Sequence, residues 1–483
     1  MHIQAKEPSS HLTDPAPGTP IRKLLDAQKL AYAKHPMPSY QERIHKLKAL
    51  KSALLTFQEP LIQAINQDFS CRSRDETLLA ELMPTIESIN YAIKHVKKWM
   101  KPSKRKVGLL FMPAKNQLHY QPLGVVGIIV PWNYPIFLAL GPLIGALSAG
   151  NRAMIKMSEF TPHLNKVLIE LLDSIYKQDT VAVIEGDAAT AIAFTEQAFD
   201  HLLFTGSTSV GRHVMMAAAK NLTPVTLELG GKSPAIISPD SPMQEACERL
   251  CFGKSLNAGQ TCVAPDYILV PKEREQAFID TYKAVFGKMY PSLKDNDDYS
   301  AIINQAQYQR LARWLDEAKN KGAICHEINP AEEDLSQGRK MAPVLVQKTE
   351  SDMTIVLDEI FGPILPIITY TSLDEALDYV KQRPRPLALY YFGHNKAEQQ
   401  KVLTQSHAGG VCINDTLVHL AQDDMPFGGV GDSGMGQYHG HEGFLTFSKA
   451  KSVHIKGHFN SAKFAYAPYK SPMHKLIYRF FIR

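Results

Sequence analysis

Three side chains of the kinds used in covalent catalysis follow apolar or small-residue segments of this 483-residue chain. Cys262 lies in residues 259–265, whose small and turn-forming residues can present a thiol to a cleft. Glu228 ends an apolar segment, where burial would raise its pKa toward the range of a general base. Asn133 lies in the turn 131–135, at the end of an expected parallel strand, where open α/β sheets place ligand-binding groups. These three groups predict covalent catalysis with an oxyanion site.

Each of these residues also has a purely structural interpretation. A single Cys in a Gly-rich segment is more often structural than nucleophilic, and Glu228 could form an ion pair with Lys232. Asn133 could simply cap its turn. The residues taken one at a time leave these alternatives open.

A phosphate site is expected at Gly206 and Ser207, between an expected strand and the helix 210–220. Backbone N–H groups and a hydroxyl at a helix N-terminus can hold a phosphate, although Gly-Ser-Thr also forms an ordinary helix cap. The letters G-x-G-x-x-G at Gly429, Gly431 and Gly434 lie in loop-like sequence. A dinucleotide fingerprint must follow a strand and open a helix, so we reject this second motif as a phosphate site.

Alternating strands and helices are expected to position these groups. Residues 40–58 have the period of an amphipathic helix, and a helical N-terminal region is expected to continue to about residue 99. Beyond residue 150, short apolar segments alternate with helical ones as far as residue 220, which predicts an α/β fold with a doubly wound parallel sheet. A second α/β domain is expected to begin near residue 230.

The window 116–151 contains no Asp, Glu, Lys or Arg and resembles a membrane span in isolation. Its β-branched run 124–130, the turn 131–135 and the apolar stretch 136–147 favour a buried strand, a turn and a buried helix instead.

Composition excludes several classes of protein. Hydrophobic residues make up 45% and charged residues 21%, as in soluble globular proteins. The net charge of +5 comes without a basic stripe, which argues against nucleic-acid binding. The six cysteines form no C-x-x-C pair, so we expect a reduced, cytoplasmic protein without a metal site. Residues 1–20 lack an apolar signal core and are expected to form a flexible lead-in.

Five segments occur in the order and approximate spacing of the NAD(P)-dependent aldehyde dehydrogenase superfamily: residues 131–135, 206–211, 227–232, 259–262 and 359–363. The resemblance covers most of the chain. Residues 259–267, 385–390 and 425–436 resemble the class 3 branch of that superfamily. Asp68-Phe69, with residues 72–74 and 76–77, is similar to bacterial coniferyl aldehyde dehydrogenases.

The resemblance implies a catalytic role for each matching residue. Cys262 resembles the nucleophile, and Glu228 the residue that activates water for deacylation. Asn133 resembles the side-chain donor to the oxyanion, assisted by the backbone N–H of Cys262. Tyr134 and Phe427 are candidate walls of the substrate pocket, although aromatic residues in apolar surroundings are usually core.

The resemblance also implies NAD as the cofactor, with NADP as the alternative. Lys156 and Glu159 match the pair that contacts the adenosine ribose, and a carboxylate at Glu159 would repel a 2′-phosphate. Met157, where the family usually has Pro, loosens the turn around Glu159 and weakens this inference. The expected cofactor site comprises Lys156, Glu159, Gly206, Ser207 (pyrophosphate contact), Gly211, Leu229, Glu359 (nicotinamide ribose) and Phe361 (packing near that ring).

The implied reaction oxidises an aldehyde to the carboxylic acid through a Cys262 thiohemiacetal, hydride transfer to the nicotinamide and a thioester. The expected substrate is an aromatic aldehyde such as coniferyl aldehyde, or a hydrophobic aliphatic one. A CoA-acylating enzyme is one alternative, against which the acid at Glu228 argues. A non-redox Cys hydrolase or a cofactor-binding scaffold is another, and it would not require Glu359 and Phe361.

The implied architecture is a Rossmann-like cofactor-binding domain (21–103 and 123–229), a catalytic domain (230–430), and an oligomerisation arm with a C-terminal tail (104–122 and 431–483). A homodimer is expected through this arm. The tail, residues 469–483, combines apolar with basic residues and is too short to span a bilayer. It needs cover from the protein's own body, from the partner subunit or, as a peripheral contact, from a membrane surface.

Overall fold

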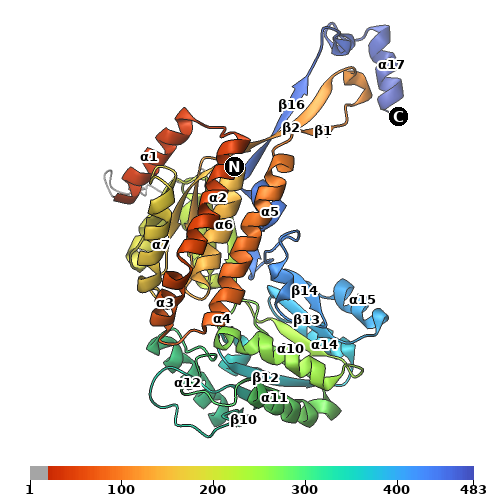
Figure 1. Cartoon of the computed structure of the whole chain (residues 1–483). Helices are drawn as coiled ribbons and strands as arrows, with labels where there is room; N and C mark the ends of the chain where they lie inside the picture. Colours follow the sequence, from red (N-terminus) through yellow and green to blue (C-terminus); the bar gives the residue numbers. More distant parts are fainter. Residues whose placement is uncertain (1–19, 483) are drawn as a thin grey trace, which may run out of the picture.

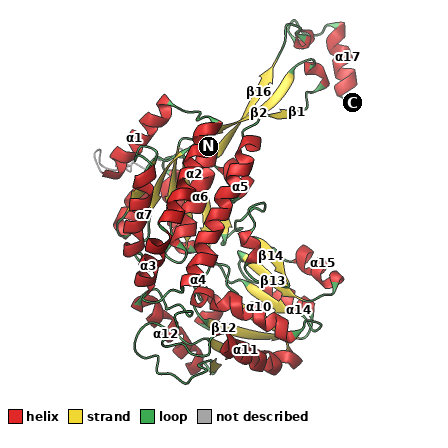
Figure 2. Ribbon diagram, in the orientation of Figure 1, coloured by secondary structure: helices red, strands yellow, loops and turns green. Residues whose placement is uncertain are grey.

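The computed structural model describes residues 20–482, which form three sheets with flanking helices (Figures 1 and 2). The predicted lead-in, residues 1–20, lies outside the described residues except for Pro20, which begins the first helix. The helical region expected from residue 40 to about 99 is confirmed as α2 (Tyr40–Thr56), α3 (Gln58–Phe69), α4 (Arg74–Thr77) and α5 (Met83–Trp99). A further helix, α1 (Pro20–Lys34), precedes it and was not expected.

The first large sheet has six strands and is parallel except at one edge. In spatial order its strands are β15 (Gly434–Met435), β7 (Val225–Leu229), β6 (His201–Gly206), β3 (Val125–Ile129), β4 (Arg152–Lys156) and β5 (Val181–Ile184). The chain runs outward from β3 in one direction through β4 and β5, and then in the other through β6 and β7. This reversal between β3 and β6 is the switch point at which doubly wound sheets bind ligands, so the predicted fold class is confirmed.

Helices cover both faces of this sheet because its strands are apolar on both sides. In β3, Val126 and Ile128 pack toward one cluster while Val125 and Ile129 pack toward another. The first face carries α2, α5, α6 (Pro135–Ala149) and α7 (Pro162–Ile175); the second carries α1, α8 (Ala188–Thr195) and α9 (Thr208–Ala219).

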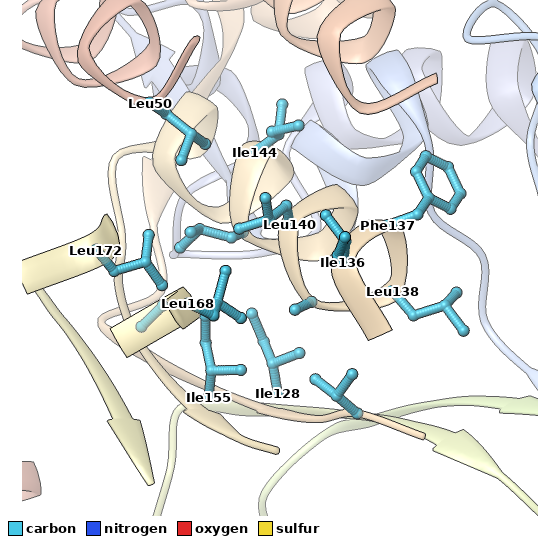
Figure 3. Close-up of a cluster of buried hydrophobic side chains, with 14 of the residues drawn as sticks. Leu50, Ile128, Ile136, Phe137, Leu138, Leu140, Ile144, Ile155, Leu168 and Leu172 are labelled. Atoms are coloured by element: carbon cyan, nitrogen blue, oxygen red, sulfur yellow. The ribbon is translucent and has the colours of Figure 1, made fainter. Parts of the chain in front are cut away.

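The uncharged window 116–151 forms the centre of this core. It contains β3, a turn and α6, which confirms the expected strand, turn and buried helix. Figure 3 shows α6 between the sheet residues Ile128 and Ile155 and the side chain of Leu50 from α2. Helix α6 is apolar on nearly all sides because it is enclosed on nearly all sides.

The second large sheet has seven strands and is parallel except at β10. In spatial order they are β10 (Ile324–Glu327), β11 (Val344–Gln347), β12 (Ile364–Tyr370), β9 (Tyr267–Pro271), β8 (Pro234–Ile237), β13 (Ala388–Phe392) and β14 (Gly410–Ile413). One face packs on α10 (Met243–Ser255), α11 (Glu275–Met289), α12 (Gln305–Asn320) and α13 (Thr354–Leu357). The other packs on α14 (Leu373–Lys381) and α15 (Lys396–Gln405).

A three-stranded antiparallel sheet forms the arm. It consists of β1 (Ser103–Arg105), β2 (Lys115–Pro122) and β16 (Ser448–Ile455), and it extends away from both large sheets with α17 (Pro472–Phe481) beyond its tip (Figure 1). Two elements of the segment assigned above to the arm and tail, 431–483, lie elsewhere. Strand β15 pairs with β7 of the six-stranded sheet, and α16 (Gly440–Thr446) packs on α5 and α6.

Of the three covers considered for the tail, the protein's own body is the one that the single chain contradicts. Leu476, Phe480 and Ile482 are 61%, 65% and 73% exposed. Helix α17 sits at the end of the arm, and it packs on the short helical turn Ser461–Ala465 (Figure 2). Its apolar side chains therefore face solvent in the isolated chain.

Candidate active site

A cavity of about 240 Å³ lies at the carboxyl ends of β3, β6 and β7, opposite the loop that precedes β9. Its walls include eight of the predicted site residues: Asn133, Gly206, Ser207, Glu228, Leu229, Cys262, Glu359 and Phe361. The parallel strands explain this gathering, because their carboxyl ends meet at one edge of the sheet. The loop that carries Cys262 and the loop that carries Glu359 precede β9 and β12 of the seven-stranded sheet and close the cavity from the other side.

Cys262 is partly exposed to this cavity. Burial, together with negative charge at Glu359 and Glu228, raises the pKa of its thiol to about 12, against the lowering effect of nearby backbone N–H groups. The thiol is therefore protonated at neutral pH. It must lose its proton before it can attack an electrophile.

Glu228 is buried, and neither of its carboxylate oxygens has a hydrogen-bond partner among residues 20–482. Burial raises its pKa well above the usual value, so the free site holds a neutral carboxyl group. The alternative ion pair with Lys232 does not form. Lys232 Nζ instead lies 2.5 Å from Asp266 Oδ2 and donates to the backbone carbonyl of Asp358, next to Glu359.

A left-handed stretch of backbone brings Cys262 to the cavity. Asn257, Ala258 and Gly259 have φ values of 53°, 51° and 74°, a conformation that L-residues adopt at a cost. A Cβ at Gly259 would collide with the backbone carbonyl of Gly362, so only glycine fits this approach. Gln260 holds the turn, since its side chain bonds the backbone of Asn257, Ala301 and Ile303.

Asn133 faces this loop from the turn that follows β3 of the six-stranded sheet. Its Nδ2 donates to the carbonyl of Gln260 at 3.2 Å, and its own carbonyl accepts from Asn257 Nδ2 at 3.1 Å. An amide donor and a thiol from two separate sheets therefore share one wall of the cavity.

The remaining walls have the features of a nucleotide groove. Ser207 is the N-cap of α9, and its Oγ accepts a hydrogen bond from the backbone N–H of Val210. Ser207 also lines the cavity, so the N-terminus of α9 lies at the cavity wall. A Cβ at Gly211 would lie 2.6 Å from Leu229, so glycine lets α9 pack closely on β7. Burial, with the charge of Asp266, raises the pKa of Glu359 to about 8, and its Oε1 has no partner in the described chain. The helix N-terminus and the unpaired carboxyl oxygen fit the phosphates and ribose of a dinucleotide.

Five predicted residues lie outside the cavity lining, and their roles stay predictions; one of them is Gly211, which packs on Leu229 as described above. Lys156 Nζ donates to the carbonyls of Met157 and Gly186, both at 2.7 Å, and Glu159 is exposed in the turn after β4. Tyr134 is buried and bonds Thr261 Oγ1 at 2.7 Å. Phe427 stacks on His439 at 5.2 Å between ring centroids.

Sequence reasoning assigned no role to Arg72, Asn257, Gln307 or Arg310. Gln307 and Arg310 line the cavity from α12, and Arg310 also donates to the carbonyl of Ile360 at 2.7 Å. The turn-forming sequence at Asn257 was a local signal that could have been used. Arg72 belongs to the segment 72–74 that resembles coniferyl aldehyde dehydrogenases, but that resemblance gave it no role, and its contact with Asn133 spans 61 residues of sequence.

Comparison with known families matches residues 18–453 to the aldehyde dehydrogenase family. This chain belongs to that family. The aldehyde dehydrogenase shares 58% identity over 463 residues with the probable coniferyl aldehyde dehydrogenase of Pseudomonas aeruginosa, covering 96% of each chain. It shares 39% identity over 432 residues with aldehyde dehydrogenase family 3 member H1 of Arabidopsis thaliana, covering 89% and 88% of the two chains. These matches confirm the class 3 branch and an NAD(P)-dependent enzyme.

Two solved structures agree with the assignment of this chain to the aldehyde dehydrogenase family. The substrate-bound state of AldH from Staphylococcus aureus is 38% identical, with a TM-score of 0.90 over 95% of this chain and 99% of that one. The aldehyde dehydrogenase of Mycobacterium tuberculosis complexed with NAD+ is 28% identical, with a TM-score of 0.82 over 91% and 90%.

Proposed function

We propose that this enzyme oxidises aromatic or hydrophobic aldehydes of the coniferyl aldehyde type to carboxylic acids, with Cys262, Glu228 and Asn133 as its catalytic groups. The observation that carries the proposal is that these three side chains, from three separate segments, line one cavity. The name of the Pseudomonas aeruginosa relative supports the substrate class.

The Cys262 thiol first gives its proton to solvent, and the resulting thiolate attacks the aldehyde carbon. A carbon–sulfur bond forms, and the carbonyl oxygen becomes an oxyanion. Asn133 Nδ2 and the Cys262 backbone N–H donate to this oxyanion, and one such donor contributes about 3 to 4 kcal/mol to transition-state stabilisation. An aldehyde has no leaving group, so the adduct can be oxidised only by loss of hydride.

NAD+, when bound, supplies the hydride acceptor. The residues that would hold it are Lys156 and Glu159 at the adenosine ribose, Ser207 at the pyrophosphate, and Glu359 and Phe361 at the nicotinamide end. Solved relatives that contain NAD+ support this choice of cofactor. Glu159 favours NAD+ over NADP+, because its carboxylate would repel a 2′-phosphate.

Glu228 completes the reaction after the thioester has formed. The neutral carboxyl group must first give its proton to solvent; the buried carboxylate that results is a strong proton acceptor, so it can take a proton from the attacking water. The resulting hydroxide adds to the thioester carbon, the carbon–sulfur bond breaks, and the carboxylic acid leaves. The position of this acid favours water over CoA as the acyl acceptor.

The test is to incubate the purified enzyme with coniferyl aldehyde and NAD+ and to measure NADH and the acid product. C262A should give no turnover and bind NAD+ normally, while C325A, a partly buried cysteine on the outer strand β10, should remain active. Absence of NADH, NADH that requires CoA, or an active C262A would each contradict the proposal. Acetaldehyde should give a lower kcat/KM than coniferyl aldehyde.

The assembly and location that we propose are a cytoplasmic homodimer that pairs through the arm. The six free cysteines support a reducing compartment. The exposed apolar side chains of α17 support a partner subunit as their cover, with a membrane surface as the competing possibility. Within the described residues, no helix is long and apolar enough to cross a membrane.

A further inference from the structure

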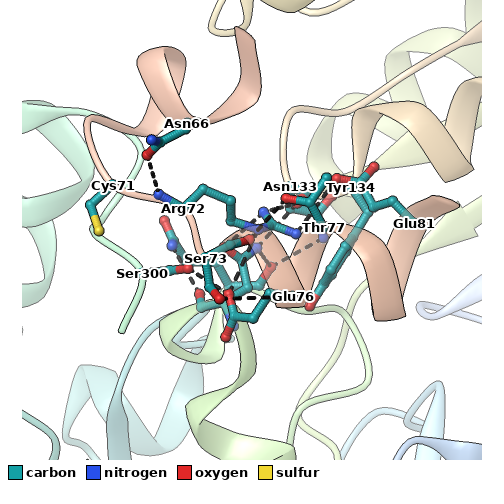
Figure 4. Close-up of polar contacts among 12 residues, drawn as sticks. Asn66, Cys71, Arg72, Ser73, Glu76, Thr77, Glu81, Asn133, Tyr134 and Ser300 are labelled. Atoms are coloured by element: carbon teal, nitrogen blue, oxygen red, sulfur yellow. Dashed lines mark hydrogen bonds and ion pairs between the residues drawn. The ribbon is translucent and has the colours of Figure 1, made fainter. Parts of the chain in front are cut away.

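Arg72 is a fully buried cation that lies beside Asn133 and Glu76 (Figure 4). It contacts both the loop that carries Asn133 and the loop that precedes Cys262. It lies between α3 and α4, in the N-terminal helical layer. Its Nη1 donates to the carbonyl of Asn133 at 2.9 Å and to Oδ1 of Asn257 at 3.0 Å. One nitrogen atom thus joins the backbone of the predicted oxyanion donor to the loop that precedes the nucleophile.

Two buried carboxylates extend this bridge to both sides. Glu81 Oε2 accepts from the backbone N–H groups of Ile136 and Phe137 at 2.7 and 3.2 Å, just after Asn133 in the chain. Glu76 Oε1 accepts from the backbone N–H of Asn257 at 2.9 Å. The guanidinium lies between these carboxylates, 3.6 Å from Glu81 and 3.7 Å from Glu76. Each carboxylate therefore holds one of the two loops, and Arg72 holds both.

Two aromatic rings fix the plane of the guanidinium. Its central carbon lies 5.0 Å from the ring centroid of Phe69 and 4.9 Å from that of Tyr134. The hydroxyl of Tyr134 in turn bonds Thr261, the residue before Cys262. A lysine could not replace this arrangement, because a single ammonium group cannot face two carboxylates and two further acceptors in one plane.

We propose that Arg72 is a positioning residue that sets the distance between the Asn133 amide and the Cys262 thiol. The inference rests on the proposed roles of Asn133 and Cys262. Arg72 makes no contact with the cavity itself, so it acts on the oxyanion through Asn133. Loss of the bridge should slow formation of NADH on the enzyme and leave NAD+ binding unchanged.

The experiment measures the rate of the first NADH burst, the Kd for NAD+ and the melting temperature of R72K. We expect a burst about 100-fold slower, the scale of a displaced catalytic group, with an unchanged Kd. R43K is the matched control, because Arg43 is equally buried and binds the carbonyls of Pro38 and Ser148 away from the cavity. R43K should lower the melting temperature without slowing the burst.

The variant N133A, alone and combined with R72K, separates this inference from the proposed function. N133A should slow the burst, and R72K added to N133A should slow it little further, because Arg72 acts through Asn133. An equal loss in both backgrounds, or a normal burst in R72K, would overturn the role of Arg72 and leave the catalytic assignment intact. A normal burst in N133A would instead overturn the role of Asn133.

N257G provides the same test if R72K fails to fold. Glycine keeps the left-handed backbone at Asn257, whose φ is 53°. It removes the side chain that links Arg72 to the Asn133 carbonyl and that also donates to the carbonyl of Gln260. The same slow burst with an unchanged Kd for NAD+ is expected. A normal burst in folded N257G would contradict the bridge.

Discussion

Three ionisable groups determine the electrostatics of the cavity: the Cys262 thiol and the carboxyls of Glu228 and Glu359. Burial favours the neutral form of all three, and each ionised carboxyl opposes ionisation of the thiol. The free enzyme therefore stores its nucleophile in the protonated form. Substitutions of Glu359 and Glu228 test this arrangement.

E359Q should lower the pKa of the Cys262 thiol. Above a pH of about 8 Glu359 is ionised, and its negative charge raises the thiol pKa toward about 12, so removal of that charge lowers it. The check is the pH dependence of iodoacetamide labelling at Cys262, followed by mass spectrometry. E327Q, on the distant strand β10, is the control and should label as the unmodified enzyme does. An unchanged labelling profile in E359Q would contradict this picture.

E228Q should keep the NADH burst and lose steady-state turnover, because the glutamine amide cannot take a proton from water. We expect a fall in kcat of at least about 100-fold, within the range of general-base contributions. Rapid-mixing absorbance of NADH measures both phases. Loss of the burst as well would assign Glu228 to an earlier step.

The same substitution should change the dependence of stability on pH. The pKa of Glu228 is raised in the folded state, so its contribution to the free energy of unfolding is complete below the unfolded pKa of about 4.3 and declines as pH rises. E228Q should therefore lose less stability than the unmodified enzyme between pH 5 and pH 8. Thermal unfolding at the two pH values is the measurement. Equal losses of stability in E228Q and in the unmodified enzyme would show that the Glu228 carboxyl is solvated.

At the scale of elements, the close packing of α9 on β7 positions the Ser207 end of the helix. G211A places a Cβ 2.6 Å from Leu229, so we expect a loss of about 1 to 3 kcal/mol in stability and weaker NAD+ binding. G287A in α11 is the control, because its Cβ would meet only Pro330 at an ordinary 3.6 Å. That substitution should stabilise the fold by up to about 1 kcal/mol. Thermal unfolding and NAD+ titration compare the two, and normal NAD+ binding in G211A would show that the helix position does not matter.

At the scale of the whole molecule, the arm and α17 present apolar surface that the single chain does not cover. We expect light scattering to give the mass of a dimer for the intact chain. Deletion of residues 469–483 should yield monomers or a weaker dimer, because the exposed apolar side chains of α17 would then no longer bind the partner. Flotation with anionic liposomes is the companion measurement. An unchanged dimer together with loss of liposome binding after truncation would show that the tail contacts a membrane instead.

The local features of this protein could be predicted from the sequence alone. The helical period of residues 40–58, the uncharged window 116–151 and the strand–helix alternation are properties of short windows, and each corresponds to an element of the structure. The resemblance of five segments to one family located Cys262, Glu228 and Asn133 before their distances were known. Such motifs are readable because turn chemistry and burial act over a few residues.

Only the tertiary structure decided which distant groups meet. Arg72 contacts Asn133 and Asn257 across 61 and 185 residues of sequence, and no local pattern identifies such a partner. The pairing of β15 with β7 and the exposure of α17 depended in the same way on how separate elements pack. The sequence therefore determined the elements and the chemical groups, while the packing of two sheets and a helical layer determined the site, because contact energies between remote segments exist only in the folded chain.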